Sequence, residues 1–336
     1  MNRILISLQE DFSPPDWFDE GRIGAYVTAV LEKLGYDGEE ILFYTIGETY
    51  RERAKNYDMG QTADADFKDD YIRAVEYFEK AIALSPTSPS GMNAKVQLAQ
   101  IKASSLDDIY PTTASFTVAP ERPALAILRY ANLPSCWLTI YKMSYDDFMA
   151  LKSDFSKKKL SKLSKFKIVY KEQVVLPEHH DYRSHTGYVE IPALPVGSYF
   201  VIVSETPVHS GEISNSKAFF HQVSDMEILK TGRSDNCTLL VVNRTTGEPI
   251  SGATVMYEHA GYDSNDRSPK SGVAVSNAKG FVNIKVPNAR YLKLYSVKWN
   301  SQILSLDQFS SRYGWNRPGN YVSQTGTFFT DRSLYR

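Results

Sequence analysis

The spacing of apolar residues changes near residue 110, and this change limits the chain to a mixed architecture. Before it, apolar side chains recur every three or four residues, as at Ile23, Val27 and Val30, which is typical of amphipathic helices. After Tyr110 and Pro111, β-branched and aromatic runs alternate with Gly, Pro, Asn and Ser, which is typical of short strands and turns. The sequence therefore predicts a helical part followed by a β-rich part.

Helical periodicity runs from Asp16 to about Ser105, and its first run stops at Gly35. Three further helices are expected over Glu39–Asn56, Asp69–Leu84 and Pro89–Ser104. The last of them is expected to bury an apolar stripe made of Val96, Leu98, Ala99 and Ile101. The helical part is expected to span residues 1–110.

The second and third helices resemble the helix pair of a tetratricopeptide repeat. The matching positions are Phe43, Ile46, Gly47, Tyr50, Ala74, Phe78, Ala81 and Pro86. The two halves lie about 15 residues farther apart than this repeat requires, so residues 57–68 are interpreted as an inserted loop. One repeat is fewer than the roughly three that a solenoid needs, so we expect a small helical cap docked on its neighbour. A peptide-binding groove is the functional alternative.

The β-rich part is predicted to form two antiparallel sandwiches. The first, over residues 111–225, has candidate strands at Ser115–Val118, Ala124–Tyr130, Trp137–Met143, Lys167–Val175, Thr186–Ile191, Ser198–Ser204 and Lys217–Val223. Within it, Tyr145–Leu163 is predicted to be a short helix and a basic loop. That loop is either a solvated connection or an anion-binding patch, formed by Lys157, Lys158, Lys159, Lys162 and Lys165.

The second sandwich is expected over residues 226–306. Its candidate strands are Met226–Thr231, Thr238–Asn243, Ala253–His259, Val273–Ser276, Phe281–Lys285, Leu292–Val297 and Ser301–Leu306. Residues 307–336 are interpreted as a linker and the truncated start of another sandwich. The fold class predicted is therefore α + β multidomain, with a helical tetratricopeptide-like module before two antiparallel immunoglobulin-like sandwiches.

Composition excludes several classes of partner. A net charge of −1 over 336 residues gives no reason to expect nucleic acid or an anionic membrane. No apolar run reaches the roughly 18 residues of a membrane span. The short apolar run Met1–Leu8 becomes acidic too soon for a secretion signal. Cys136 and Cys237 lie in different predicted sandwiches, so we expect no disulfide between them.

One polar loop gathers the candidate metal ligands His179, His180 and His185, next to Glu178 and Asp181. Imidazoles and carboxylates can hold a transition metal. The alternative is a solvated hairpin loop, because consecutive residues of an extended chain point apart. The sequence contains neither a nucleophile elbow, nor a glycine-rich phosphate loop, nor a His-Glu-x-x-His motif. We therefore expect no enzyme activity and no cofactor.

A two-part turn pattern lies in the second sandwich. Thr246-Gly247-Glu248-Pro249 is predicted to turn the chain, Gly252 lets it bend closely, and Ala253 re-enters the core. A second turn ends at Gly280. Together they resemble the signature of extracellular sandwich modules, which adhesins and polysaccharide-binding repeats share.

The last residues resemble the FTDRSIYRPGQ segment of the alpha-2-macroglobulin family. The matching residues are Phe329, Thr330, Asp331, Arg332, Tyr335 and Arg336, preceded by Phe328. The match stops before the family's Pro-Gly. The order of a sandwich, the Thr-Gly-Glu-Pro sandwich and this segment also agrees with the family, and Bacteroidetes-type members place tetratricopeptide-like sequence first. The resemblance implies that both sandwiches are macroglobulin-like domains of an N-terminal fragment.

This resemblance implies a large exported trap that a protease activates by cleaving a bait region. In many members a thioester within Cys-Gly-Glu-Gln then bonds to the protease. Trp137 follows Cys136 and Thr238 follows Cys237, so neither cysteine fits that motif. The implied role is a non-catalytic scaffold in the periplasm or at the cell surface. Its implied partners are downstream domains of the same protein and, through the whole molecule, proteases.

The alternative function is that of a cell-surface adhesion or carbohydrate-binding protein built from similar sandwiches. Trp137, Trp299 and Trp315 are the candidate sugar-stacking residues, because flat indole rings can pack on sugar faces. The sugar-binding interpretation thus requires these tryptophans to lie together on one exposed face, which the trap interpretation does not require.

Overall fold

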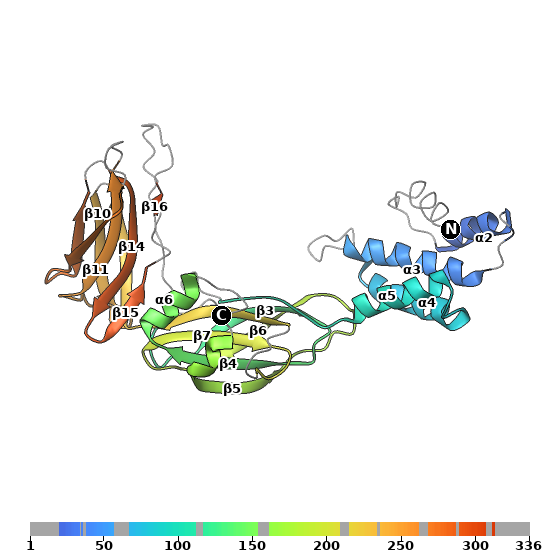
Figure 1. Cartoon of the computed structure of the whole chain (residues 1–336), viewed down its shortest axis with the longest axis horizontal. Helices are drawn as coiled ribbons and strands as arrows, with labels where there is room; N and C mark the ends of the chain where they lie inside the picture. The colour runs from blue at the N-terminus through green and yellow to red at the C-terminus, as the bar shows by residue number, and fades with distance from the viewer. Residues whose placement is uncertain are drawn as a thin grey trace. The chain divides into compact units, whose positions relative to one another are not determined.

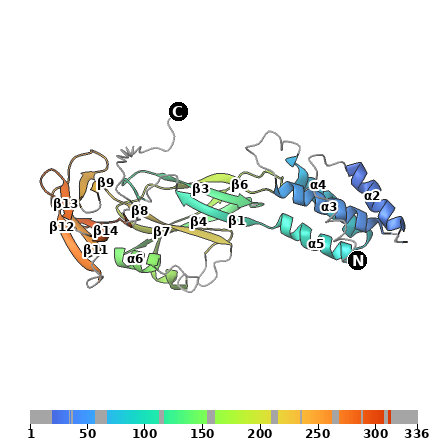
Figure 2. The same cartoon turned by 90° about the horizontal axis from the view of Figure 1, so that it is seen from above.

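The chain is described from a computed structural model, shown in Figure 1 and, turned by 90°, in Figure 2. The structure describes residues 20–33, 35, 38–56, 67–111, 117–153, 161–208, 215–233, 236–261, 268–286, 289–306 and 311–312. The chain divides into two compact units. The first combines Met1–Ser105 with Tyr130–Pro134 and Pro177–His185, and the second contains the remainder. The helical unit therefore includes two segments that lie among the strands in sequence.

The helical unit contains α2 (Glu20–Lys33), α3 (Glu39–Lys55), α4 (Asp70–Leu84) and α5 (Pro89–Lys102), drawn in blue to cyan in Figure 1. The predicted boundaries of the last three are confirmed to within two residues. Gly35 follows α2 with a left-handed φ of 66°, as expected of a residue that ends a helix. α5 begins with Pro89 at its first turn, and the Ser88 hydroxyl accepts a hydrogen bond from Gly91 N at 3.1 Å.

α3 and α4 approach closely because small residues lie between them. A Cβ at Gly47 would lie 2.8 Å from the Phe78 ring, so the ring packs directly on the backbone of α3. Ala74 and Ala81 are fully buried on the facing side of α4. An ion pair between Arg53 and the buried carboxylate of Asp70 also joins the helices. The residues that resemble a repeat thus form this helix–helix interface.

The predicted stripe of α5 is partly wrong. Val96 is 54% exposed and Ala99 is also exposed, whereas Ile101 is buried. The buried face instead carries Ser90, Gly91 and Ala94, together with Ile101. The physical reason is space: Cβ of a residue at position 91 would lie 1.9 Å from the Ser85 carbonyl oxygen, so only glycine fits there and α5 presents its small residues to the preceding segment.

The first sandwich has two sheets. A three-stranded sheet has the order β1 (Ser105–Pro111), β3 (Ala124–Ala131), β6 (His185–Ile191). A five-stranded sheet has the order β2 (Thr117–Val118), β8 (Ser216–Val223), β7 (Gly197–Ser204), β4 (Ser135–Met143), β5 (Lys167–Val175). Pairing is antiparallel between β8, β7, β4 and β5, and parallel between β2 and β8. β1 was not predicted, because its buried residues Leu106 and Ile109 are three apart, as in a helix.

One end of the five-stranded sheet is covered by α6 (Tyr145–Ser153), the helix predicted within residues 145–163. Phe148 and Leu151 pack there on Phe200 and Ile202 of β7. The Ser144 hydroxyl accepts a hydrogen bond from Asp147 N at 3.1 Å and so caps the helix. The short helix predicted in this range is therefore present, and a 3-10 helix (η2, Ser161–Lys165) lies at its far end.

The second sandwich also has two sheets (Figures 1 and 2). One has the order β13 (Phe281–Lys285), β10 (Asn236–Asn243), β9 (Met226–Arg233). The other has the order β12 (Lys270–Val275), β11 (Thr254–Gly261), β14 (Ala289–Trp299), β15 (Gln302–Ser305), and β16 (Ser311–Arg312) pairs with β14. Buried aliphatic side chains from both sheets form one core, including Leu239, Val255, Val282 and Leu294. All seven predicted strands are present, and β16 was not predicted.

Candidate functional site

The loop Pro177–His185 contains the predicted histidine cluster and belongs to the helical unit. Two of its residues, His180 and Tyr182, have left-handed φ values of 53° and 59°, which residues with side chains seldom adopt. The carboxylate of Asp181 accepts a hydrogen bond from the backbone N–H of Arg183 at 3.0 Å. The loop therefore has a specific, tightly turned conformation.

Arg183 fixes this loop on the helices. Its guanidinium donates hydrogen bonds to the carbonyls of Ala54 at 2.9 Å, Phe67 at 2.7 Å and Lys68 at 2.9 Å. The group also lies 5.0 Å from the centre of the Tyr71 ring. Ala54 is in the last turn of α3, where carbonyls lack helical partners and favour a cation. Arg183 thus supplies a donor to three backbone carbonyls, at the end of α3 and just before α4.

A second loop contact is made at the end of α5. The Asn132 side-chain amide donates to the carbonyls of Ile101 at 2.7 Å and Ala103 at 3.0 Å. Asn132 has a φ of 51°, a conformation that asparagine tolerates better than most residues. Neither Arg183 nor Asn132 was singled out from the sequence. No local pattern marks them, because the acceptors of Arg183 lie 115 to 129 residues away.

The histidines are arranged as stacked rings. The rings of His179 and His185 are parallel within 12°, with centres 3.6 Å apart. Nε2 of His185 lies 2.7 Å from a carboxylate oxygen of Asp181. Burial opposes ionisation of Asp181, but the hydrogen bonds from His185 and Arg183 outweigh it and lower the pKa of that carboxyl. The ionised carboxylate of Asp181 therefore stabilises the loop by accepting these hydrogen bonds.

The three metal-ligand candidates do not converge. His180 is exposed and faces Glu178, whose carboxylate lies 3.4 Å from its Nε2. His179 and His185 face each other through their rings, and a ring face carries no lone pair for a metal. In the described part of the chain, no group of three or more His, Cys, Asp or Glu side chains is arranged to hold a metal ion. The loop joins β5 to β6, which belong to different sheets, so the hairpin alternative is wrong and the loop is a connection between sheets.

Two small cavities adjoin the loop, each of about 280 Å³. One is lined by the loop itself, with Tyr130, Leu133 and His185. The other is lined by Arg51 and Lys55 of α3 together with residues of α5. Pockets for small organic ligands usually enclose roughly 300–1,000 Å³, so both lie just below that range.

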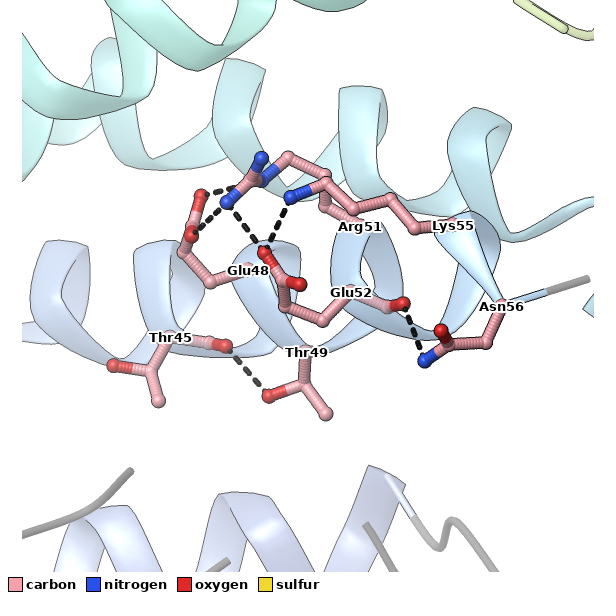
Figure 3. A network of polar contacts seen from close by, with 7 residues as sticks. All are labelled: Thr45, Glu48, Thr49, Arg51, Glu52, Lys55 and Asn56. Carbon is pink, nitrogen blue, oxygen red and sulfur yellow. Dashed lines mark hydrogen bonds and ion pairs between the residues drawn. The ribbon is translucent and has the colours of Figure 1, made fainter. Parts of the chain in front are cut away.

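Figure 3 shows the carboxylate partners of Arg51 and Lys55, the two cations that line the cavity next to α5. The guanidinium of Arg51 is paired with Glu48 at 2.8 Å and with Glu52 at 2.6 Å. Lys55 donates to the same Glu52 carboxylate at 2.7 Å. Burial disfavours the charged guanidinium, yet the hydrogen bond to Glu48 raises the pKa of Arg51. Each positive charge therefore already has a carboxylate partner on its own helix.

The Thr-Gly-Glu-Pro segment forms a tight turn after β10. The Asn243 side chain accepts hydrogen bonds from the backbone N–H groups of Thr245 and Thr246, both at 2.9 Å. The N–H of Gly247 donates to the Asn243 carbonyl at 2.8 Å, and Gly247 has a left-handed φ of 75°. The turn predicted from sequence is therefore present, closed by local contacts.

The second half of the pattern lies against the first. Val241 of β10 donates its N–H to the Gly280 carbonyl at 2.9 Å and accepts from the Ile250 N–H at 2.9 Å. Gly280 has a φ of 77°, and a Cβ there would lie 2.5 Å from the Val241 carbonyl oxygen. Gly252 is also left-handed, with a φ of 75°, and Ala253 is fully buried. The two turns thus close on one strand.

A buried ion pair lies beside this turn. Nη1 of Arg244 is 2.6 Å from the Glu227 carboxylate, and both side chains are mostly buried. Burial raises the pKa of Glu227 and lowers that of Arg244, while their mutual attraction acts in the opposite direction. Nε of Arg244 is buried without a hydrogen-bond partner. The pair joins β9 to the start of the turn.

The two cysteines are free and fully buried. Cys136 is on β4 and Cys237 on β10, so they belong to different sandwiches, as predicted. Burial raises the pKa of the Cys136 thiol to about 11, which keeps it protonated and unreactive at neutral pH.

Several sequence candidates are separated by the fold or lie outside the described residues. Trp137 is on β4 of the first sandwich, whereas Trp299 packs against the core of the second, and Trp315 is not described. Of the lysine cluster, Lys165 pairs with Asp147 at 2.8 Å. The side chains of the other four lysines, the segment 57–66 and the motif residues from Phe328 to Arg336 are not described. No described helix is long and apolar enough to cross a membrane.

Comparison with known proteins gives remote likenesses alone. No family model and no curated protein matches the sequence. A crystal structure of native alpha-2-macroglobulin from Escherichia coli spanning domains MG0-NIE-MG1 is 14% identical, covers 60% of this chain and 63% of its own, and has a TM-score of 0.40. A shorter structure of that protein spanning NIE-MG1 is 14% identical and covers 60% of this chain and 97% of its own, with a TM-score of 0.37.

A structure of a Salmonella alpha-2-macroglobulin variant is 12% identical, with a TM-score of 0.34. It covers 60% of this chain, and this chain spans 12% of its length. At these identities and TM-scores, the likeness assigns no function to the chain.

Proposed function

We propose that this chain is a non-catalytic scaffold portion of an exported alpha-2-macroglobulin-like protease trap. The supporting observation is the meeting of both signature turns at Val241, whose N–H donates to the Gly280 carbonyl and whose carbonyl accepts from the Ile250 N–H. The two halves of a discontinuous sequence signature therefore serve one structural purpose. If either turn matched the signature by chance, there would be no reason for both turns to bond to the same strand.

The chemistry of this signature favours a scaffold. Gly247 and Gly280 are needed for their left-handed backbone, and Asn243 for its hydrogen bonds to backbone N–H groups. Ala253 is needed because its position is fully buried. The residues of the pattern thus hold a sandwich together, and none supplies a nucleophile or a general base.

The terminal segment supports the proposal from sequence alone. Phe329-Thr330-Asp331-Arg332 and Tyr335-Arg336 follow the Thr-Gly-Glu-Pro sandwich in the order that the Bacteroidetes-type family members have. On this proposal both sandwiches are macroglobulin-like domains, and the protein acts in the periplasm or at the cell surface. Downstream domains of the same chain would then be its structural partners.

The helical unit has a supporting role in this proposal. We interpret α3 and α4 as one tetratricopeptide-like helix pair, because Gly47 packs on Phe78 and the matching alanines are buried. Within the same unit, Arg183 donates to the Ala54 carbonyl at the end of α3, and Asn132 donates to the Ile101 carbonyl at the end of α5.

The experiment is a trapping assay on the full-length gene product. Incubation with an active endopeptidase is expected to cleave the product and retain the protease in a complex that digests small substrates but not proteins. The same protease with its nucleophile blocked is the control and should not be retained. Failure to retain any active endopeptidase, despite cleavage, would overturn the trap proposal. The present chain alone is expected to leave the protease fully active.

A further inference from the structure

The edge strands of the sheets differ in their protection. An unpaired strand edge invites another strand, and natural edges are commonly blocked by charges, proline or short length. β5 has Lys167, Lys171 and Glu172 along its length, and β1 has Asp107 and Asp108. β12 has none of these features between Ser271 and Val275, where the sequence is Ser-Gly-Val-Ala-Val.

The main chain of β12 has an open side. Among the described residues β12 pairs only with β11, in a register that sets Thr254 opposite Val275. The N–H of Ser276 donates to the Ala253 carbonyl at 2.9 Å, so Ser276 directs its main-chain groups toward the β11 side. Alternate residues of an antiparallel strand point these groups to opposite sides. Those of Val275, Val273 and Ser271 therefore point to the open edge.

The side chains along this edge are apolar and exposed. Val273 is 62% exposed and Val275 is 58% exposed. Met256 of β11, opposite Val273 in the register, is 50% exposed. An apolar patch on an edge segment without charges, here Ser271–Val275, is typical of a surface that another strand covers.

We propose that β12 pairs with β12 of a second copy of this chain, antiparallel and with Val273 opposite its own symmetry mate. This two-fold register is self-consistent. Val273 points its main-chain groups outward, so the Val273 residues of the two copies exchange N–H···O=C hydrogen bonds. Ser271 of each copy exchanges the same kind of bonds with Val275 of the other copy. The exposed valines of both copies then lie together on the outer face.

The charge of the strand is compatible with pairing to a second copy. The one charged residue of β12, Lys270, would lie opposite Ser276 of the partner in this register, so no like charges meet. On the other face Gly272 would lie opposite Ala274, and neither side chain is large enough to obstruct the approach. The edge can thus pair with itself through hydrogen bonds, without a steric clash and without like charges opposite each other. This association is independent of the scaffold proposal and goes beyond it.

The register predicts a specific cross-link. In a directly hydrogen-bonded antiparallel pair the Cα atoms lie about 5.5 Å apart, within the range that a disulfide spans. A Val273→Cys variant is therefore expected to form a covalent dimer on mild oxidation. Val275→Cys is the matched control, because each introduced thiol would face Ser271 of the partner. The native cysteines are buried and do not compete.

Sedimentation equilibrium of the uncross-linked chain is the second measurement. We expect reversible dimerisation with a dissociation constant on the order of 10–100 μM, since a single strand pair buries less area than a standard interface. Val273→Lys should raise this constant at least about tenfold by placing two charges opposite each other, whereas Val273→Thr should leave it nearly unchanged. Circular dichroism and thermal unfolding verify that both variants fold.

Defined outcomes would overturn the proposal. It is wrong if the folded chain is monomeric at concentrations well above this range and Val273→Cys does not cross-link. It is equally wrong if Val275→Cys cross-links as readily as Val273→Cys, or if the folded Val273→Lys variant dimerises like the parent chain. Preferential cross-linking through position 273, together with dissociation by lysine there, would establish the two-fold edge pairing.

Discussion

The loop Pro177–His185 and the Thr246–Pro249 turn are both irregular segments with left-handed residues, but they are stabilised by different means. The loop depends on Arg183, whose acceptors belong to residues more than a hundred positions away. The turn depends on Asn243 and Gly247, which bond to their immediate neighbours. The first is built by tertiary contacts and the second by local ones, and their responses to substitution should differ accordingly.

The largest expected effect is that of Arg183→Ala. Three backbone carbonyls would lose their donor, and the cost should be about 3–4 kcal/mol of unfolding free energy in the helical unit. Arg183→Lys should recover only part of it, because an ammonium cannot reproduce the planar fork. Urea unfolding followed by helical circular dichroism measures the loss. Arg129→Ala, at an exposed position, is the control, and an equal loss there would contradict the prediction.

Gly280→Ala tests the place where the local turn meets a neighbouring strand. The added Cβ would lie 2.5 Å from the Val241 carbonyl oxygen in a backbone with a φ of 77°, so we expect a loss of about 3 kcal/mol. Gly247→Ala is the matched control: its φ is 75° but nothing lies within 4 Å. About 1 kcal/mol is expected there. Equal losses in urea unfolding would mean that glycine is required at position 280 because of its backbone conformation and not because of the close approach of Val241.

Asn243→Ala tests the Thr246–Pro249 turn, whose hydrogen bonds are all local. It removes the acceptor for the N–H groups of Thr245 and Thr246, and a loss of about 1–2 kcal/mol is expected. Asn243→Asp should retain most of the stability, because aspartate offers the same acceptor. Amide exchange at Thr245 and Thr246 is the direct measurement. Unchanged exchange in the alanine variant would contradict the assigned hydrogen bonds.

The smallest expected effect is a difference between the loop and the turn in how amide exchange responds to low pH. Asp181 has a folded pKa lowered from 3.8, so its contribution is present above that value and is lost as pH falls through the lower folded pKa. Amide exchange in the loop should therefore accelerate in acid more than exchange in the Asn243 turn, after correction for intrinsic rates. Asp181→Asn should abolish this difference. An acid response that persists in the variant would assign it to another group.

The secondary structure was largely predictable because its signals are local. Helix and strand periodicity located α3, α4 and α5 and the strands β3 to β15, and Gly35 was recognised as a helix end. The errors share a cause. β1 spaces its buried residues like a helix, and α5 buries Gly91 rather than Val96, because contacts with other segments, not propensity, decide which face is covered.

The candidate site was less predictable. The histidines were recognised by residue type, but their stacking and the pairing of His185 with Asp181 depend on how the loop turns. The sequence by itself determined the two-part turn pattern of the second sandwich, since glycine conformation and asparagine hydrogen bonds act within a few residues. Only the tertiary structure decided that Arg183 joins a loop between strands to the helices, and that β12 has no second neighbour among the described strands. Both depend on residues distant in sequence, and no local spacing encodes which distant backbone groups a side chain or a strand edge will meet.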